Sequence, residues 1–225
     1  MEVRGVRMKV ELHLHTSRRS ACAISDPEEL LRAAANLGYE AVYLTEHHDV
    51  WPEAELAELQ AAVPEIRIFP GVELNLTFDP LQHLLVLGTS DPEYLTIFNP
   101  GKVLAKARAE GHLTILAHPF RWPGAGQILD EGLLPDAIEH RTCNQGFSRS
   151  AQAEERAEQL HLPLVNAGDT HSVAMLGRFW IETTRPIVHA DDIRDIILAG
   201  EYSCRTAEDP VFFRPGFTHG LGRVL

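Results

Sequence analysis

The sequence predicts an α/β fold in which parallel strands alternate with crossover helices. Short apolar runs that are typical of strands alternate with amphipathic, helix-like segments along the chain. No linker or low-complexity segment interrupts this alternation. The 225 residues, 44% of them hydrophobic, can bury a full core, so we expect residues 1–225 to form a single domain.

The predicted strands are short apolar runs, and helical patterns separate most of them. Seven strands are expected, at residues 8–16, 40–48, 66–75, 83–89, 113–120, 136–141 and 162–172. In the first helix, Ser25 or Asp26 is the N-cap, Pro27 takes an early position and Gly38 follows the end. Further helices are predicted within residues 99–112, 149–161 and 189–201.

Charge and cysteine usage narrow the class of partner and compartment. The 20 basic and 32 acidic residues give a net charge of −12, which disfavours stable binding to nucleic acid and leaves small anionic substrates open. No apolar run is long enough to span a membrane, and no signal-like segment opens the chain. Cys22, Cys143 and Cys204 are widely spaced and form no C-x-x-C pair. We therefore expect a cytoplasmic protein without a disulfide framework.

The first predicted strand contains an H-x-H pair within VELHLHTS, residues 10–17. Side chains two residues apart in a strand point to the same face, so His13 and His15 are expected to converge, with Leu12 and Leu14 facing the other way. Two imidazoles on one face can serve one metal ion. A pair of structural histidines is the alternative for this motif alone.

Other histidines and carboxylates stand at the ends of the later predicted strands. Parallel strands that are joined by crossover helices place their carboxyl ends on one rim, where α/β enzymes carry their chemistry. The candidate metal ligands on this rim are His13, His15, His47, Glu73, His83, His118, Asp169 and His171. His83 opens its predicted strand, so its place on the rim depends on the direction of that strand.

The ligand types indicate a transition-metal hydrolase with more than one ion. Neutral imidazoles and carboxylates without clustered thiolates suit zinc, manganese or iron. One ion takes three or four protein ligands, so eight candidates imply at least two ions. Glu73 is the predicted bridging carboxylate, because its strand lies between those that carry the histidines.

Five short motifs make the chain similar to the polymerase and histidinol phosphatase (PHP) family of metal-dependent phosphoesterases. They are ELHLHTS, LTEHHD, FPGVEL, LAHPF and AGDTHS, in the order that the family has them. The resemblance spans nearly the whole chain. It implies a distorted, TIM-like (β/α)7 barrel with a di- or trinuclear site at the carboxyl rim, and it implies hydrolysis of phosphate esters.

The resemblance also implies how the ligands are shared. His13, His15, Glu73 and Asp169 would hold one ion, Glu73, His83 and His118 a second, and His47 and His171 would contribute to a third. The chain departs from the family pattern in SRRSACAIS, residues 17–25, which lacks the expected Asp or His, and at Glu46, which replaces an Asp. We therefore expect two tightly held ions and a third that is weak or absent.

The implied mechanism is attack by a metal-bound hydroxide on a small phosphate ester, including nucleotides. Asp169, Glu73 and His171 are the predicted catalytic groups. Glu11, Glu46 and Glu139 are the predicted carboxylates that orient the histidine rings. The chain has no phosphate-binding GxxxxGK[ST] loop, so Arg18 and Arg141 are predicted to bind the substrate phosphate. Specificity is expected in the rim loops at residues 121–134 and 142–150.

Two other classes of function remain open from the sequence. An amidohydrolase-like enzyme that cleaves C–N or C–O bonds also carries an H-x-H pair and a late-strand Asp, but the bridging lysine common in such enzymes has no counterpart here. Lys9, Lys102 and Lys106 all lie away from the rim. A non-catalytic metal-binding PHP module is the third class, and the oligomeric state is open.

Overall fold

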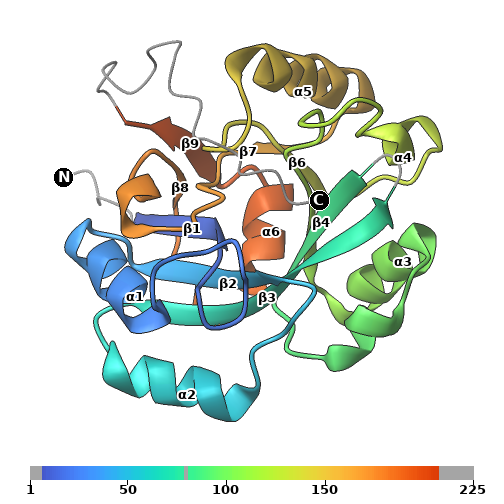
Figure 1. Cartoon of the computed structure of the whole chain (residues 1–225). Helices are drawn as coiled ribbons and strands as arrows, with labels where there is room; N and C mark the ends of the chain where they lie inside the picture. Colours follow the sequence, from blue (N-terminus) through green and yellow to red (C-terminus); the bar gives the residue numbers. More distant parts are fainter. Residues whose placement is uncertain (1–6, 79–80, 208–225) are drawn as a thin grey trace.

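The computed structural model describes residues 7–78 and 81–207 (Figure 1). Their strands form one sheet in the order β7-β6-β5-β4-β3-β2-β1-β8-β9. The strands are β1 Met8–Leu14, β2 Ala41–His47, β3 Arg67–Phe78, β4 Leu81–Leu87, β5 Leu113–Ala117, β6 Ala137–Glu139, β7 Leu164–Val165, β8 Phe179–Thr183 and β9 Tyr202–Thr206. The sheet therefore runs through nearly the whole described chain.

Six α-helices surround or cap the sheet of the described residues, and Figure 1 shows most of them outside the strands. They are α1 Pro27–Asn36, α2 Glu53–Ala62, α3 Pro100–Glu110, α4 Gln127–Asp130, α5 Phe147–Leu160 and α6 Asp192–Leu198, with short 3₁₀ turns at Pro92–Thr96 and Val173–Met175. The predicted start of α1 is confirmed, since the Asp26 side chain accepts a hydrogen bond from the Glu28 N–H. Within the same residues no helix is long and apolar enough to cross a bilayer.

The sheet curls into a nearly closed barrel. Its two edge strands, β7 and β9, approach each other, and the Tyr202 hydroxyl donates to the Leu164 carbonyl at 2.7 Å. The segment after β7 then pairs with β1, where the His15 N–H donates to the Thr170 carbonyl at 2.8 Å and the Thr170 N–H to the His13 carbonyl at 3.0 Å. The predicted α/β barrel-like fold is confirmed.

Two details of the predicted sheet were wrong. The seven expected strands correspond to β1–β7, but β8 and β9 were not predicted. Moreover, β4 runs antiparallel to both β3 and β5, because the two residues between β3 and β4 are too few for a crossover helix. The start of β4 consequently lies at the rim where the parallel strands end, and there His83 pairs with Asn75 of β3 and Ala117 of β5.

Helix α6 fills the barrel interior at the end opposite this rim, and Figure 1 shows it in the middle of the ring of strands. Its Ile193, Ile196 and Ile197 are buried in one apolar cluster with Val10, Leu12, Leu85, Ile115 and Val165 from the strands. The candidate metal ligands lie at the other end. These apolar side chains pack closely and fill the barrel beneath the rim.

A β-bulge in β1 changes which side chains face the interior. The register of β1 against β2 shifts between Glu11 and Leu14. Leu14 packs in an outer cluster, as expected, but Leu12 packs in the interior cluster with Val10, so the prediction that it faces away from the histidines was wrong. Bulges commonly re-aim side chains at active sites.

The buried carboxyl group of Glu11 holds this bulge. Its Oε1 accepts hydrogen bonds from the N–H groups of Leu12 at 3.1 Å, His13 at 3.2 Å and Gly168 at 2.7 Å. Burial raises the pKa of Glu11 to about 7, although the backbone donors oppose the shift. The carboxyl group thus ties β1 to the segment that follows β7.

The raised pKa of Glu11 predicts a pH-dependent stability. A carboxyl group whose pKa is raised in the fold stabilises the protein below its unfolded pKa, and this contribution is lost as the pH rises through about 7. For metal-free protein, we expect the stability of the wild type relative to Glu11→Gln to fall by up to about 3 kcal/mol between pH 5 and 8. Urea unfolding at several pH values measures this difference, and parallel pH curves for the two proteins would contradict it.

Candidate metal centre

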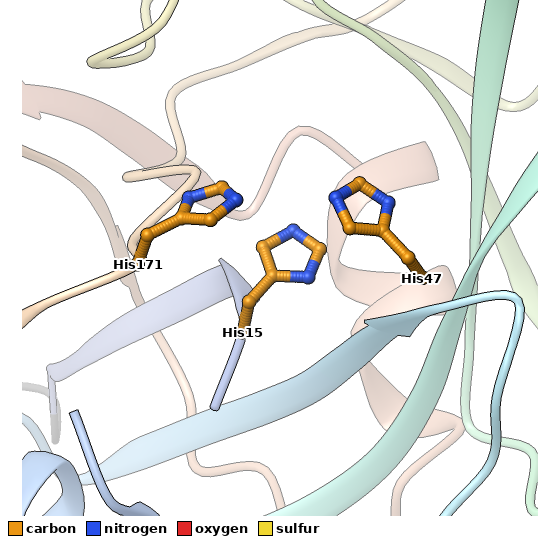
Figure 2. A group of neighbouring side chains, drawn as sticks. All are labelled: His15, His47 and His171. Atoms are coloured by element: carbon orange, nitrogen blue, oxygen red, sulfur yellow. The ribbon is translucent and has the colours of Figure 1, made fainter. Parts of the chain in front are cut away.

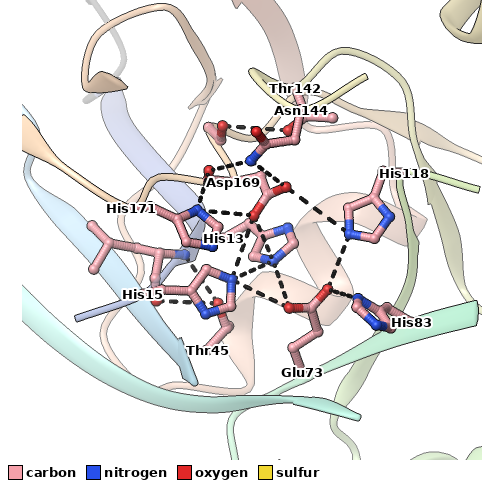
Figure 3. A network of polar contacts seen from close by, with 12 residues as sticks. His13, His15, Thr45, Glu73, His83, His118, Thr142, Asn144, Asp169 and His171 are labelled. Atoms are coloured by element: carbon pink, nitrogen blue, oxygen red, sulfur yellow. Dashed lines mark hydrogen bonds and ion pairs between the residues drawn. The ribbon is translucent and has the colours of Figure 1, made fainter. Parts of the chain in front are cut away.

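The structure brings the eight predicted ligand side chains together at the carboxyl rim, and Figure 3 labels all of them except His47. They come from or directly follow five strands and the segment after β7: His13 and His15, His47, Glu73, His83, His118, Asp169 and His171. Their ligand atoms form four overlapping groups, and within each group the atoms lie within 4.8 Å of one another. The antiparallel direction of β4 is what brings His83 into this set.

Glu73 lies at the middle of the centre, and its side chain is fully buried. Its Oε1 lies 2.7 Å from His83 Nδ1 and 3.1 Å from His118 Nε2, whereas its Oε2 lies 2.8 Å from His47 Nδ1 and 3.2 Å from His15 Nε2. Burial alone would raise the pKa of Glu73, but the surrounding histidines outweigh it and hold that pKa well below its usual range. Each oxygen therefore faces a different set of imidazoles.

Asp169 faces the same point from the opposite side. Its Oδ1 lies 3.4 Å from the Nε2 atoms of both His13 and His15 and makes no hydrogen bond within the described chain. Asn144 donates to Oδ2 at 2.7 Å and to the Asp169 carbonyl at 3.0 Å, and the backbone at Asp169 has a positive φ of 48°. Such a backbone conformation is uncommon and typical of functional sites.

His15, His47 and His171 form the outer part of the centre (Figure 2). The ring of His15 lies 4.3 Å from that of His47 and 4.4 Å from that of His171, between centroids. His171 Nδ1 donates to the Asp169 carbonyl at 2.9 Å, which leaves Nε2 available. Burial and the neighbouring His15 lower the pKa of His171 to about 4, so this ring is neutral and suited to metal ligation.

The donor set fits divalent metal ions. His13 Nε2 and His15 Nε2 lie only 2.9 Å apart, and both face carboxylate oxygens. Fully buried nitrogen lone pairs and carboxylates in such proximity are costly without a cation between them. Imidazole nitrogens with carboxylate oxygens are ligands that zinc, manganese and iron accept.

Family models match two parts of the chain. The PHP domain model matches residues 11–118, and the PHP-associated model matches residues 149–202, so together they span more than half of the chain. The chain belongs to the PHP family. A curated relative, the PolC-type DNA polymerase III of Oceanobacillus iheyensis, is 36% identical over 75 residues, which are 32% of this chain and 5% of the polymerase.

Solved structures share the fold of this PHP protein at low sequence identity. A two-domain protein from Bacteroides vulgatus with a predicted PHP-like metal-dependent phosphoesterase has a TM-score of 0.67 at 17% identity, over 91% of this chain and 66% of that one. A Chromobacterium violaceum amidohydrolase has a TM-score of 0.62 at 15% identity, over 86% and 97%. A lesion-specific endonuclease from Pyrococcus furiosus has 0.60 at 13%, over 88% and 58%.

The three predicted supporting carboxylates act in different ways. Glu139 contacts the ligands directly, since its Oε1 lies 3.0 Å from His13 Nδ1 and its Oε2 accepts from the His118 N–H at 2.6 Å. Glu46 accepts from the hydroxyl group of Ser20, which in turn lies 3.3 Å from His15 Nδ1. Glu11, by contrast, holds backbone N–H groups and not a ring.

Among the arginines of the described residues, Arg121 lies next to a predicted ligand, and sequence reasoning missed it. Its Nη1 lies 3.7 Å from Asp169 Oδ2, and its guanidinium group lies over the Trp122 ring at 4.8 Å. The predicted Arg18 pairs with Asp26 at 3.4 Å, and the predicted Arg141 lies 5.8 Å from the Phe147 ring. The signal for Arg121 was its place three residues after His118, in a loop already expected to control specificity.

The protonation of the metal-free centre predicts how it responds to metal. Burial opposes protonation of both His13 and His47. Asp169 and Glu73 nevertheless raise the pKa of His13, and Cys22 and Glu73 raise the pKa of His47 to about 9. Adding Zn²⁺ or Mn²⁺ to chelator-treated protein at pH 7.5 should therefore release protons and raise Tm. Calorimetry in two buffers of different ionisation enthalpy, with thermal unfolding, measures both effects.

His13→Ala should weaken both effects. The exposed His189, which is remote from the ligand set in sequence and lies just before α6, provides the matched control, so His189→Asn should respond like the wild type. A wild-type Tm that does not change with either ion would contradict a metal centre at these residues.

Proposed function

We propose that this PHP protein hydrolyses phosphate esters at a centre of two divalent metal ions. The observation that carries the proposal is the position of Glu73, whose two carboxylate oxygens face separate sets of histidines. His13, His15, Glu73 and Asp169 would hold one ion, and Glu73, His83 and His118 the second. His47 and His171 would contribute to a weaker third position. Bound ions would polarise the phosphoryl group and lower the pKa of a water molecule.

The protein's own groups then have distinct tasks. Asn144 holds Oδ2 of Asp169, so Oδ1 is the oxygen left to ligate or to accept a proton. Arg121 lies beside Asp169, where its guanidinium group can pair with a phosphoryl oxygen. Glu139 fixes the Nδ1 side of His13 and so presents Nε2 to the centre. When the third position is empty, Nε2 of the neutral His171 can accept a proton from substrate or solvent.

We further propose that the two matched regions act as one PHP-type unit over the whole chain. Strands β1 to β5 lie within the PHP domain match or at its edges, and β7 and β8 lie within the PHP-associated match. All of them belong to one sheet, and the centre takes Glu73 from the first region and Asp169 from the second.

The proposed substrates are small or nucleotide phosphate esters. A net charge of −12 disfavours binding of long nucleic acids. The similarity to a segment of a DNA polymerase and to the fold of an endonuclease supports nucleotides as substrates. We also propose a cytoplasmic location, because Cys22, Cys143 and Cys204 are widely spaced in the sequence and form no C-x-x-C pair. The similarity to an amidohydrolase fold makes C–N or C–O hydrolysis the second candidate.

The experiment is a hydrolysis screen with protein loaded separately with manganese, zinc or iron. The panel contains phosphomonoesters, phosphodiesters, N-acyl compounds and lactones. Release of phosphate or cleavage of a diester supports the proposal, and cleavage of only the acyl compounds or lactones supports the amidohydrolase alternative. Bound metal without turnover of any substrate would favour a non-catalytic metal-binding module.

Substitution of Glu73 tests the bridging role. Glu73→Gln keeps the size of the side chain but removes the charge between the ions, so metal content should fall by about one equivalent and phosphate release by roughly a hundredfold. Glu73→Asp keeps the charge and should lie between this variant and the wild type. Elemental analysis and turnover are measured together. Wild-type metal content in Glu73→Gln would contradict the bridge.

A further inference from the structure

A cavity of about 330 Å³ lies between two loops of the rim. Its walls come from the loop after β5 and from the start of α5, and its main lining residues are Phe120, Trp122, Ala125, Ser148, Arg149 and Gln152. The segments in which the sequence predicts substrate specificity, residues 121–134 and 142–150, contain most of these lining residues. The volume is in the range of small-molecule sites.

Trp122 is shared by this cavity and the metal centre. Its ring centroid lies 5.2 Å from that of His83 and 5.3 Å from that of His118, and both contacts are edge-on. The preceding residue, Arg121, lies over the same ring and reaches Asp169. A substrate whose phosphoryl group lies at the metal centre can therefore extend past Trp122 into the cavity.

Three polar side chains of the cavity have no hydrogen-bond or ion-pair partner among the described residues. Most arginines of the described chain pair with carboxylates, yet the guanidinium group of the half-buried Arg149 makes no hydrogen bond or ion pair within residues 7–78 and 81–207. The Ser148 hydroxyl and the Gln152 amide are likewise without partners there. An unpaired cation in a chain of net charge −12 is suited to an anionic ligand.

We propose that this cavity binds the leaving group of the ester, and that it selects a leaving group with a flat ring and a second anionic group. The ring would contact Trp122 and Phe120, and the anionic group would pair with Arg149. This inference rests on the proposed phosphoesterase function. In that reaction, water forms a new P–O bond, the P–O bond to the leaving group breaks, and the leaving oxygen takes up a proton.

Two matched aryl phosphates test the selection. 4-Carboxyphenyl phosphate has a ring and an anion, whereas 4-carbamoylphenyl phosphate has the same shape without the charge. Wild-type protein should have the higher kcat/KM for the carboxylate, and Arg149→Gln should reduce the ratio of the two kcat/KM values by about tenfold. Arg108→Gln, which removes a cation from a separate cavity beside α3, should keep the wild-type ratio.

Binding of 4-hydroxybenzoate, the leaving group itself, gives a readout without turnover. Isothermal titration calorimetry should show binding to wild-type protein, weaker binding to Arg149→Gln and to Trp122→Leu, and unchanged binding to Arg108→Gln. If the wild type cleaves both aryl phosphates and Arg149→Gln leaves the ratio unchanged, the cavity assignment is overturned while the proposed function stands. If no phosphate ester is cleaved, the proposed function fails, and the calorimetry alone decides whether the cavity takes a ring-bearing anion.

Discussion

The hydrogen bonds of the Glu11 carboxyl group are the constraint on which the rest of the centre depends. One oxygen holds the N–H groups of Leu12 and His13 at the bulge of β1, and also the N–H of Gly168. The bulge turns His13 and His15 toward the interior, and Gly168 precedes Asp169. A Cβ atom at Gly168 would lie 2.2 Å from Thr170 Oγ1 and 2.6 Å from Glu11 Oε2, so only glycine permits this approach. One buried acid therefore sets the relative position of ligands that are more than 150 residues apart in the chain.

Much of the centre could be predicted because its chemistry is local in sequence. The histidines and carboxylates stand at strand ends, and a rim of parallel strands brings such ends together whatever the detailed topology. The start of α1 could also be predicted, because Asp26 and Pro27 are strong signals for a helix N-terminus. These features follow from patterns of a few neighbouring residues.

The missed features all depend on contacts that are distant in sequence. Leu12 faces the interior because a bulge, stabilised in part from Gly168, shifts the register, and strict alternation carries no sign of it. Strand β8 pairs with β1, and β9 pairs with β8 at the edge of the sheet, so both strands are defined by partners that are distant in sequence. Arg121 was overlooked because its role comes from Asp169 across the rim and from stacking on Trp122.

The candidate ligands differ in burial, and this difference ranks the proposed metal positions by expected affinity. The side chains of His13, His15, Glu73 and Asp169 are at most 1% exposed, whereas those of His47 and His171 are 31% and 16% exposed. Electrostatic attraction is stronger where water is excluded, so the buried set would bind a cation more strongly than His47 and His171, which are open to solvent. The loop at residues 17–25 supplies Cys22 beside His47 in place of a carboxylate or histidine. Both features would make the outer position the weakest of the three in the proposed arrangement, and they leave Glu73 to link the two more buried positions, with Oε2 toward His13 and His15 and Oε1 toward His83 and His118.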